Sequence, residues 1–167
     1  MSGTERPAGP AEPADPALPA DPALLSGSAL AVFRLNGQFL AAAERMARPA
    51  GLTAAWWQVL GAVLREPLPV AGIARAMGIT RQSVQRIADL LVRRGLAEYR
   101  QNPAHRRAKL LAPTAEGRAA VARVGPAHTE FAARLGEALG GPEEFRYVLA
   151  VLTRLSEVMD GLPDTRG

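Results

Sequence analysis

The sequence predicts a mainly α-helical fold with one short β-hairpin. Apolar residues recur every three or four positions over most of residues 28–160, which is the repeat of a helix with a buried face. Thr, Gly and Pro stand between these stretches, where helices usually begin and end. Residues 96–112 differ, because two short segments there flank a polar turn, which is typical of a hairpin.

The composition limits which classes of protein the chain can belong to. The chain has 167 residues, about one domain, and only 5% aromatic residues, so aliphatic side chains and alanine should fill the core. It has no cysteine, which excludes disulfides and thiolate metal sites, and only His105 and His128 as histidines, so we expect neither a metal site nor a cofactor. No apolar run reaches the ~18 residues of a membrane span. Because no secretory signal is present either, we expect a cytoplasmic protein.

The N-terminal segment has its own pattern. Over residues 7–23, Pro stands at every third position and is followed each time by Ala. Proline fixes φ and lacks an N–H donor, so this stretch should form neither helix nor sheet. Residues 1–23 together carry a net charge of −3. We expect residues 1–27 to be a disordered acidic tail, and we favour a passive tail over a docking segment.

The first predicted helix, residues 28–48, has two apolar rows. One row includes Leu35 and Phe39, and the other includes Phe33 and Leu40. Two apolar rows on one helix require burial on two sides. One side can pack on the core of the chain, and a second subunit is the simplest partner for the other.

Three helices are predicted in the middle of the chain and two at its end. Thr53, Thr80 and Thr114 are good N-caps, and Gly78 and Gly95 suit helix ends. The predicted helices cover residues 53–64, 70–77, 80–94, 114–139 and 142–160. The predicted strands cover residues 96–100 and 106–112. We expect a bend at Gly125-Pro126 and a frayed end over residues 161–167. The last helix should bury Phe145, Val148, Leu149, Leu152, Leu155 and Met159.

Positive charge is concentrated in one segment. Between Ile79 and Lys109 there are eight basic and two acidic residues, a net +6, and 19 of the 20 basic residues of the chain are Arg. Arginine binds phosphate through a planar fork. An anionic partner is therefore expected, with nucleic acid first, although a basic protein without such a partner has the same composition.

The helix predicted over residues 80–94 has the chemistry of a DNA-reading helix. Val84, Ile87, Ala88 and Leu91 form one apolar stripe, and the opposite face carries Arg81, Gln82, Gln85, Arg86 and Asp89. Arginine can bond guanine, and glutamine can bond adenine, each through two hydrogen bonds. An ordinary solvated helix face also contains such residues. The Arg-bearing hairpin that follows, which could enter a narrow minor groove, makes the arrangement a winged helix-turn-helix.

The sequence resembles the MarR-type family of bacterial winged-helix transcription regulators. The resemblance is carried by residues 52–60 (LTAAWWQVL), 70–96 and 102–117, within a region of about 28–160. It implies a homodimer held by helices at residues 28–48 and 114–160, with a DNA-binding lobe at 53–112 that includes a two-stranded β-hairpin wing. It further implies binding of double-stranded DNA at a pseudo-palindromic site, usually as a repressor. Positions carried over from the family give DNA contacts at Thr80, Arg81, Gln82, Ser83, Gln85, Arg86, Arg106, Arg107 and Lys109.

The resemblance also implies that this chain could bind a small effector, as many members of the family do. A small, often aromatic or anionic compound binds between the dimerisation helices and the DNA-binding lobe of those relatives, which then release DNA. The candidate residues here are Asn36, Phe39, Trp56 and Trp57, for which ordinary packing is the preferred interpretation. His128 is interpreted as a core or interface residue rather than a ligand.

His105 departs from the family pattern, which commonly has an acidic residue that orients a wing arginine. Either the neutral imidazole accepts a hydrogen bond, which we favour, or DNA affinity rises as His105 gains a proton in mildly acidic solution. Without cysteine, the chain cannot be one of the thiol-based peroxide sensors of the family.

Two other function classes were weighed. The sequence has no nucleophile elbow, phosphate-binding Gly-rich loop, HExxH motif or carboxylate cluster, so we do not expect an enzyme. A helical protein-interaction scaffold, or a DNA-binding regulator without an effector, remains the alternative. Salt dependence separates a DNA-binding protein from a scaffold, because each phosphate contact adds to the salt sensitivity of binding.

Overall fold

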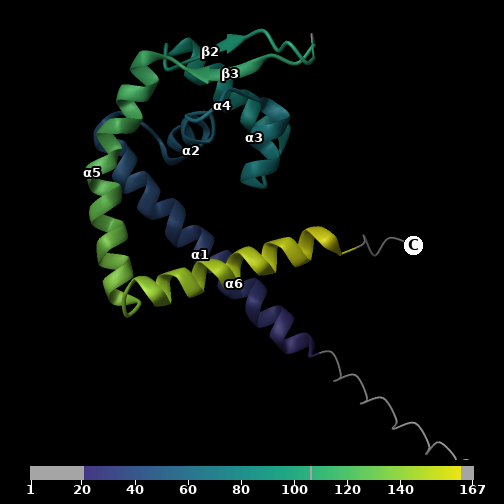
Figure 1. Cartoon of the computed structure of the whole chain (residues 1–167), viewed down its shortest axis with the longest axis vertical. Helices are drawn as coiled ribbons and strands as arrows, with labels where there is room; N and C mark the ends of the chain where they lie inside the picture. The colour runs from purple at the N-terminus through teal and green to yellow at the C-terminus, as the bar shows by residue number, and fades with distance from the viewer. Residues whose placement is uncertain (1–20, 106, 163–167) are drawn as a thin grey trace, which may run out of the picture. The chain divides into compact units, whose positions relative to one another are not determined.

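The computed structural model describes residues 21–105 and 107–162, and it is mainly helical (Figure 1). The larger helices are α1 (Pro22–Ala47), α2 (Ala54–Ala62), α3 (Val70–Met77), α4 (Arg81–Arg93), α5 (Ala115–Ala138) and α6 (Pro142–Gly161). A short 3₁₀ turn, η1, covers Arg48–Ala50. The strands are β1 (Leu68–Pro69), β2 (Ala97–Arg100) and β3 (Leu110–Pro113). The predicted fold class is confirmed.

The chain consists of two compact units whose boundary lies inside α1, after Gly37. The described part of the first unit is the N-terminal portion of α1. Several large apolar side chains of this portion are exposed to solvent, namely Leu24, Leu25, Leu30, Val32 and Phe33. The second unit contains the remaining elements and the core.

The second unit is built on a small antiparallel sheet with the strand order β1–β3–β2 (Figure 1). Leu111 in the central strand faces Leu68 on one side and Tyr99 on the other. Beneath the sheet lie α2, α3 and α4, with α3 and α4 forming the helix-turn-helix. Gly78 joins these two helices at φ 64°, a backbone conformation that favours glycine.

The core is aliphatic, as the low aromatic content predicts. Its largest fully buried side chains are Leu60, Ile73, Leu91, Leu111, Val59, Val63, Val84 and Val124. The stripe predicted on α4 is buried at Val84, Ala88 and Leu91, with Ile87 half-buried. This stripe fixes the rotation of α4 and leaves its polar face outward.

Side-chain caps define where the helices begin. The hydroxyls of Thr53, Thr80 and Thr114 each accept one hydrogen bond, from the backbone N–H of the residue three positions later. These N-caps are as predicted. α2 has a second contact at its start, because Glu44 of α1 accepts a 2.7 Å hydrogen bond from the N–H of Ala54. The C-terminal end of α1 is thereby held against the lobe.

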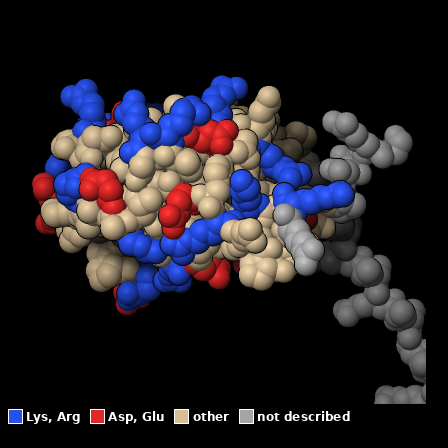
Figure 2. Space-filling view, turned by 90° about the horizontal axis from the view of Figure 1, so that it is seen from above, with Lys and Arg blue, Asp and Glu red and all other residues tan. Residues whose placement is uncertain are grey.

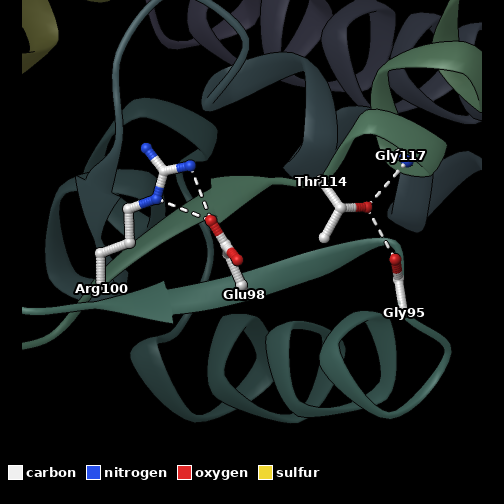
Figure 3. Close-up of polar contacts among 5 residues, drawn as sticks. All are labelled: Gly95, Glu98, Arg100, Thr114 and Gly117. Carbon is white, nitrogen blue, oxygen red and sulfur yellow. Dashed lines mark hydrogen bonds and ion pairs between the residues drawn. The ribbon is translucent and has the colours of Figure 1, made fainter.

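Thr114 also links α5 to the end of α4. Its hydroxyl donates to the carbonyl of Gly95 at 2.7 Å while it accepts from the N–H of Gly117 at 3.1 Å (Figure 3). The backbone N–H of Thr114 donates to the carbonyl of Leu96 at 3.2 Å. We call these residues the α4–α5 clamp, because they join the first turn of α5 to the residues that follow α4.

Two elements begin at other residues than expected, and one strand was not expected at all. α1 begins at Pro22, not at residue 28, since proline is tolerated in the first turn of a helix and Ala follows it. β3 begins at Leu110 rather than at residue 106, because residues 107–109 form a turn before it. The strand β1 was not expected, since two residues ending in proline carry little β signal. The rest of the predicted tail, residues 1–20, and the segment 163–167 lie outside the described residues.

The expected burial of the α6 side chains is not found within one chain. Leu149 is 62% exposed, Met159 64% and Leu155 39%, while Phe145, Val148 and Leu152 are half-buried. The prediction was wrong for a single chain because this apolar row faces away from the core. No helix within residues 21–105 and 107–162 combines the length and the apolar character that crossing a bilayer requires.

Candidate nucleic-acid interface

The outward face of α4 carries the polar side chains that the sequence placed there. Arg81, Gln82, Gln85 and Arg86 are all exposed. A shallow groove along this face is lined by Gln82, Gln85, Arg86, Asp89 and Arg93. These side chains follow the helical repeat of three and four, so they form one continuous row along α4.

The start of α4 is fixed by Thr80. Its hydroxyl accepts from the N–H of Ser83 at 3.2 Å and donates to the Oγ of Ser83 at 2.8 Å. Both functions of the Thr80 hydroxyl are thus used in the cap. The Ser83 hydroxyl accepts from Thr80 and keeps its own hydrogen for another acceptor.

A hydrogen-bonded cluster ties the middle of α4 to the wing. Tyr99 of β2 donates from its hydroxyl to Oδ1 of Asp89 at 2.7 Å. Gln85 donates from Nε2 to the Tyr99 hydroxyl at 2.7 Å and to Oδ1 of Asp89 at 2.9 Å. Burial, together with the hydrogen bond to Asp89, raises the pKa of Tyr99 to about 12. We call this set the Gln85–Asp89–Tyr99 cluster.

A cationic groove of about 410 Å³ lies between α4, the start of α3 and the wing. Arg81 contributes from α4, Arg107 and Lys109 from the wing, and Gln85 and Tyr99 also line it. The Lys109 Nζ lies 6.0 Å from the centre of the Tyr99 ring, within the range of a cation–π contact. Three positive charges from two elements therefore converge on one opening, which suits a phosphate chain.

The wing contains a polar turn before β3. The side chain of Asn102 accepts from the N–H of Ala104 at 3.0 Å, and the N–H of His105 donates to the Asn102 carbonyl at 3.2 Å. His105 and Arg107 are exposed, and the predicted contact residue Arg106 lies outside the described residues. The view onto the sheet from above shows Lys and Arg side chains spread over this face, with Asp and Glu between them (Figure 2).

An ion pair within β2 neutralises one cation of the wing. Glu98 accepts from Nε of Arg100 at 2.8 Å, and its Oε1 lies 2.6 Å from the guanidinium NH2 (Figure 3). Arg100 is therefore one of the eight basic residues of this segment that is already paired, and the net +6 counts this pair as neutral. Arg81, Arg107 and Lys109 line the cationic groove, and none of them forms an ion pair with another of the described residues.

The four candidate effector residues are divided between the two units. Asn36 belongs to the first unit, and Phe39, Trp56 and Trp57 belong to the second. Phe39 is 47% exposed, whereas both tryptophans are half-buried and pack against the core. The Arg94 guanidinium lies 4.9 Å over the Trp56 ring, and the Trp57 ring meets the His128 ring edge-on at 5.5 Å.

Sequence reasoning missed the roles of Asp89 and Tyr99 in this site. Asp89 was placed on the outward face of α4 without a function, and Tyr99 was placed only within a strand. The signal was present in part, because Gln85 and Asp89 stand four residues apart on one helix face. The contact with Tyr99 depends on how β2 folds back on α4, which spacing does not give.

Comparison with known proteins places this site in a family. Residues 50–108, which contain α2, the helix-turn-helix and most of the wing, match the MarR family. Rv2011c of Mycobacterium tuberculosis is 47% identical over 87 residues, which is 52% of this chain. The matched region spans 61% of the length of that relative.

Solved structures extend the likeness to most of the chain. The transcriptional regulator MosR of M. tuberculosis, in complex with DNA, is 25% identical with a TM-score of 0.64, over 78% of this chain and 96% of MosR. CouR from Rhodococcus jostii, bound to p-coumaroyl-CoA, is 28% identical with a TM-score of 0.59, over 83% of this chain and 93% of CouR. With the matched residues, the winged lobe and the outward polar row of α4, these likenesses lead to one conclusion: the chain has the winged helix-turn-helix fold of MarR-type transcriptional regulators, and its residues 50–108 match the MarR family.

Proposed function

We propose that this protein binds double-stranded DNA sequence-specifically, as a homodimer, and regulates transcription. The observation that carries the proposal is the exposed Arg and Gln row of α4 beside the cationic groove. A major groove about 12 Å wide admits one helix, and the wing cations then lie near the adjacent phosphates. The complex of the related MosR with DNA supports the same partner.

Binding to selected DNA at several salt concentrations tests this function. Duplexes enriched from a random library should contain a repeated half-site, with the centres about 34 Å apart for two recognition helices. The log of affinity against the log of salt should fall with a slope of about −0.9 per phosphate contact. A helical scaffold, the alternative function, would enrich no duplex at any salt concentration.

The homodimer is supported by apolar side chains left exposed on two helices. On α6 these include Tyr147, Leu149, Val151 and Val158, and on α1 they include Phe33. Large apolar patches on a monomer mark interaction sites. Equilibrium sedimentation should give twice the mass of one chain. A single-chain mass at the concentrations that bind DNA would contradict this part of the proposal.

We further propose that the protein is a repressor that a small aromatic or anionic effector releases from DNA. CouR, a relative by structure, was solved with p-coumaroyl-CoA bound, which supports an aromatic effector. Phe39, Trp56 and Trp57, with Asn36, remain the candidate contacts. A screen of aromatic acids and their thioesters by tryptophan fluorescence tests this. A compound that changes the emission should also weaken binding to the selected duplex.

A further inference from the structure

The Gln85–Asp89–Tyr99 cluster lies on the face of α4 that we propose reads DNA. All three polar atoms are within 2.9 Å of one another: Gln85 Nε2, Asp89 Oδ1 and the Tyr99 hydroxyl oxygen. Gln85 also lines both the α4 groove and the cationic groove. A side chain proposed to read a base is thus already engaged by two neighbours in the free protein.

The chemistry of the partners fixes the orientation of the Gln85 amide. A carboxylate only accepts hydrogen bonds, so the amide nitrogen, and not the amide oxygen, faces Asp89. The Tyr99 phenol has a single hydrogen, which it donates to Asp89. Because the pKa of Tyr99 is raised to about 12, the phenol keeps that hydrogen at neutral pH. The phenol oxygen therefore accepts from Gln85, as the carboxylate does.

This orientation turns the Oε1 of Gln85 away from the cluster. A free glutamine reads adenine through two bonds, accepting from N6 and donating to N7. With Nε2 held by Asp89 and Tyr99, the group left to a base is the acceptor Oε1. In the major groove, adenine N6 and cytosine N4 are donors, whereas guanine and thymine present only acceptors to such a side chain.

We propose that Asp89 and Tyr99 are positioning residues that hold Gln85 as a hydrogen-bond acceptor, so that it selects a base with a major-groove amino group. The base is adenine or cytosine on one strand of each half-site. This inference rests on the proposed DNA-binding function and adds to it a specificity rule for one position. Neither positioning residue needs to touch the DNA.

The experiment first locates the base pair that Gln85 reads. The full-length protein and its Gln85→Ala variant are each used to select duplexes from a random library. The base-pair position that loses its sequence preference in Gln85→Ala is the position that Gln85 reads. Four duplexes that differ only there are then titrated with the wild type, with Tyr99→Phe and with the double variant Asp89→Ala/Tyr99→Phe.

Glu98→Ala is the matched control, since it removes one negative charge from the same strand as Tyr99 and leaves the cluster intact. The double variant and Glu98→Ala each lose a negative charge, which raises their affinity for any DNA, so the readout is the ratio of affinities among the four duplexes. Circular dichroism confirms that each variant is folded. Tyr99→Phe keeps the ring and removes one acceptor, so it tests the inference even if the double variant does not fold.

The affinities of the wild type for the adenine and cytosine duplexes should agree within about threefold. Its affinity for the guanine duplex should be about tenfold lower. The double variant should gain about a tenfold preference for adenine over cytosine, because its freed amide can make both bonds. Tyr99→Phe should shift the ratio in the same direction, and Glu98→Ala should leave it unchanged. An unchanged ranking in both cluster variants overturns the inference alone, whereas a wild type that enriches no duplex overturns the proposed function with it.

Discussion

At the residue scale, Gly117 lies where the first turn of α5 passes the backbone that follows α4. A Cβ at this position would lie 1.9 Å from the carbonyl oxygen of Leu96. That oxygen already accepts the N–H of Thr114, so it has no freedom to move away. The need for glycine here comes from close approach of two backbones, not from an unusual φ.

Gly117→Ala should therefore lower the free energy of unfolding by about 1–3 kcal/mol, the usual cost of forcing atoms into a filled space. Gly61→Ala is the matched control, because Gly61 is also helical and has nothing within 4 Å of its Cβ position. That control should gain about 0.5–1 kcal/mol. Urea denaturation of the three proteins measures both changes, and equal stabilities would contradict the clash.

At the same scale, Tyr99 makes the stability of the folded chain depend on pH. Its pKa is raised in the folded chain from 10.0 to about 12, first by burial and then by Asp89. A raised pKa means that the folded state holds the proton more tightly than the unfolded state. The resulting stabilisation is complete below pH 10 and is lost as the pH rises toward 12.

The wild type should thus lose more stability than Tyr99→Phe between pH 10 and pH 12. Thermal melts of both proteins across this range measure the difference. Groups that titrate in both proteins cancel in the comparison. Parallel curves for the two proteins would show that the phenol proton contributes nothing to folding.

At the scale of elements, α4 and the wing should contribute differently to DNA binding. Arg86→Ala should cost about 1–3 kcal/mol on a selected duplex and much less on random DNA, because a base contact carries sequence information. Lys109→Ala should weaken binding evenly on both, as a phosphate contact does. Arg134→Ala on α5 is the control for loss of charge. Competition titrations on the two DNAs measure these effects, and equal losses for Arg86→Ala would rule out base reading.

Local chemistry explains why the helices were predictable from sequence. Thr53, Thr80 and Thr114 cap the helices that they were expected to cap, and the periodicity of α4 gave its buried and outward faces. β1 and the cluster around Tyr99 were not predictable, because both depend on partners distant in the chain. The outward row of α4 was therefore foreseen, but not the orientation of Gln85 within it.

At the scale of the whole molecule, one chain leaves much apolar surface uncovered. The expected burial of the α6 row failed because periodicity reveals that a face is apolar but not which chain covers it. Leu149 and Val151 remain 62% and 47% exposed. The sequence signal for these residues is the same as for a core helix.

Leu149→Glu should shift the protein from dimer to monomer and weaken operator binding at least tenfold, because a charge in an apolar interface loses its hydration. Ala150→Glu adds the same charge to the next position on α6, in the polar row, and should leave the dimer intact. Equilibrium sedimentation and DNA titration report the two effects. A dimer that persists in Leu149→Glu would place the interface elsewhere.

The α4–α5 clamp has a mechanical consequence. α5 has 24 residues, about 36 Å at 1.5 Å per residue, and its first turn is fastened by Thr114 to the residue where the α4 helix has just ended. The clamp is not the only link, because Ala120 and Val124 of α5 are buried in the same core as Val84 and Leu91 of α4. A tilt of the first half of α5 is therefore expected to turn α4, the helix that we propose reads bases.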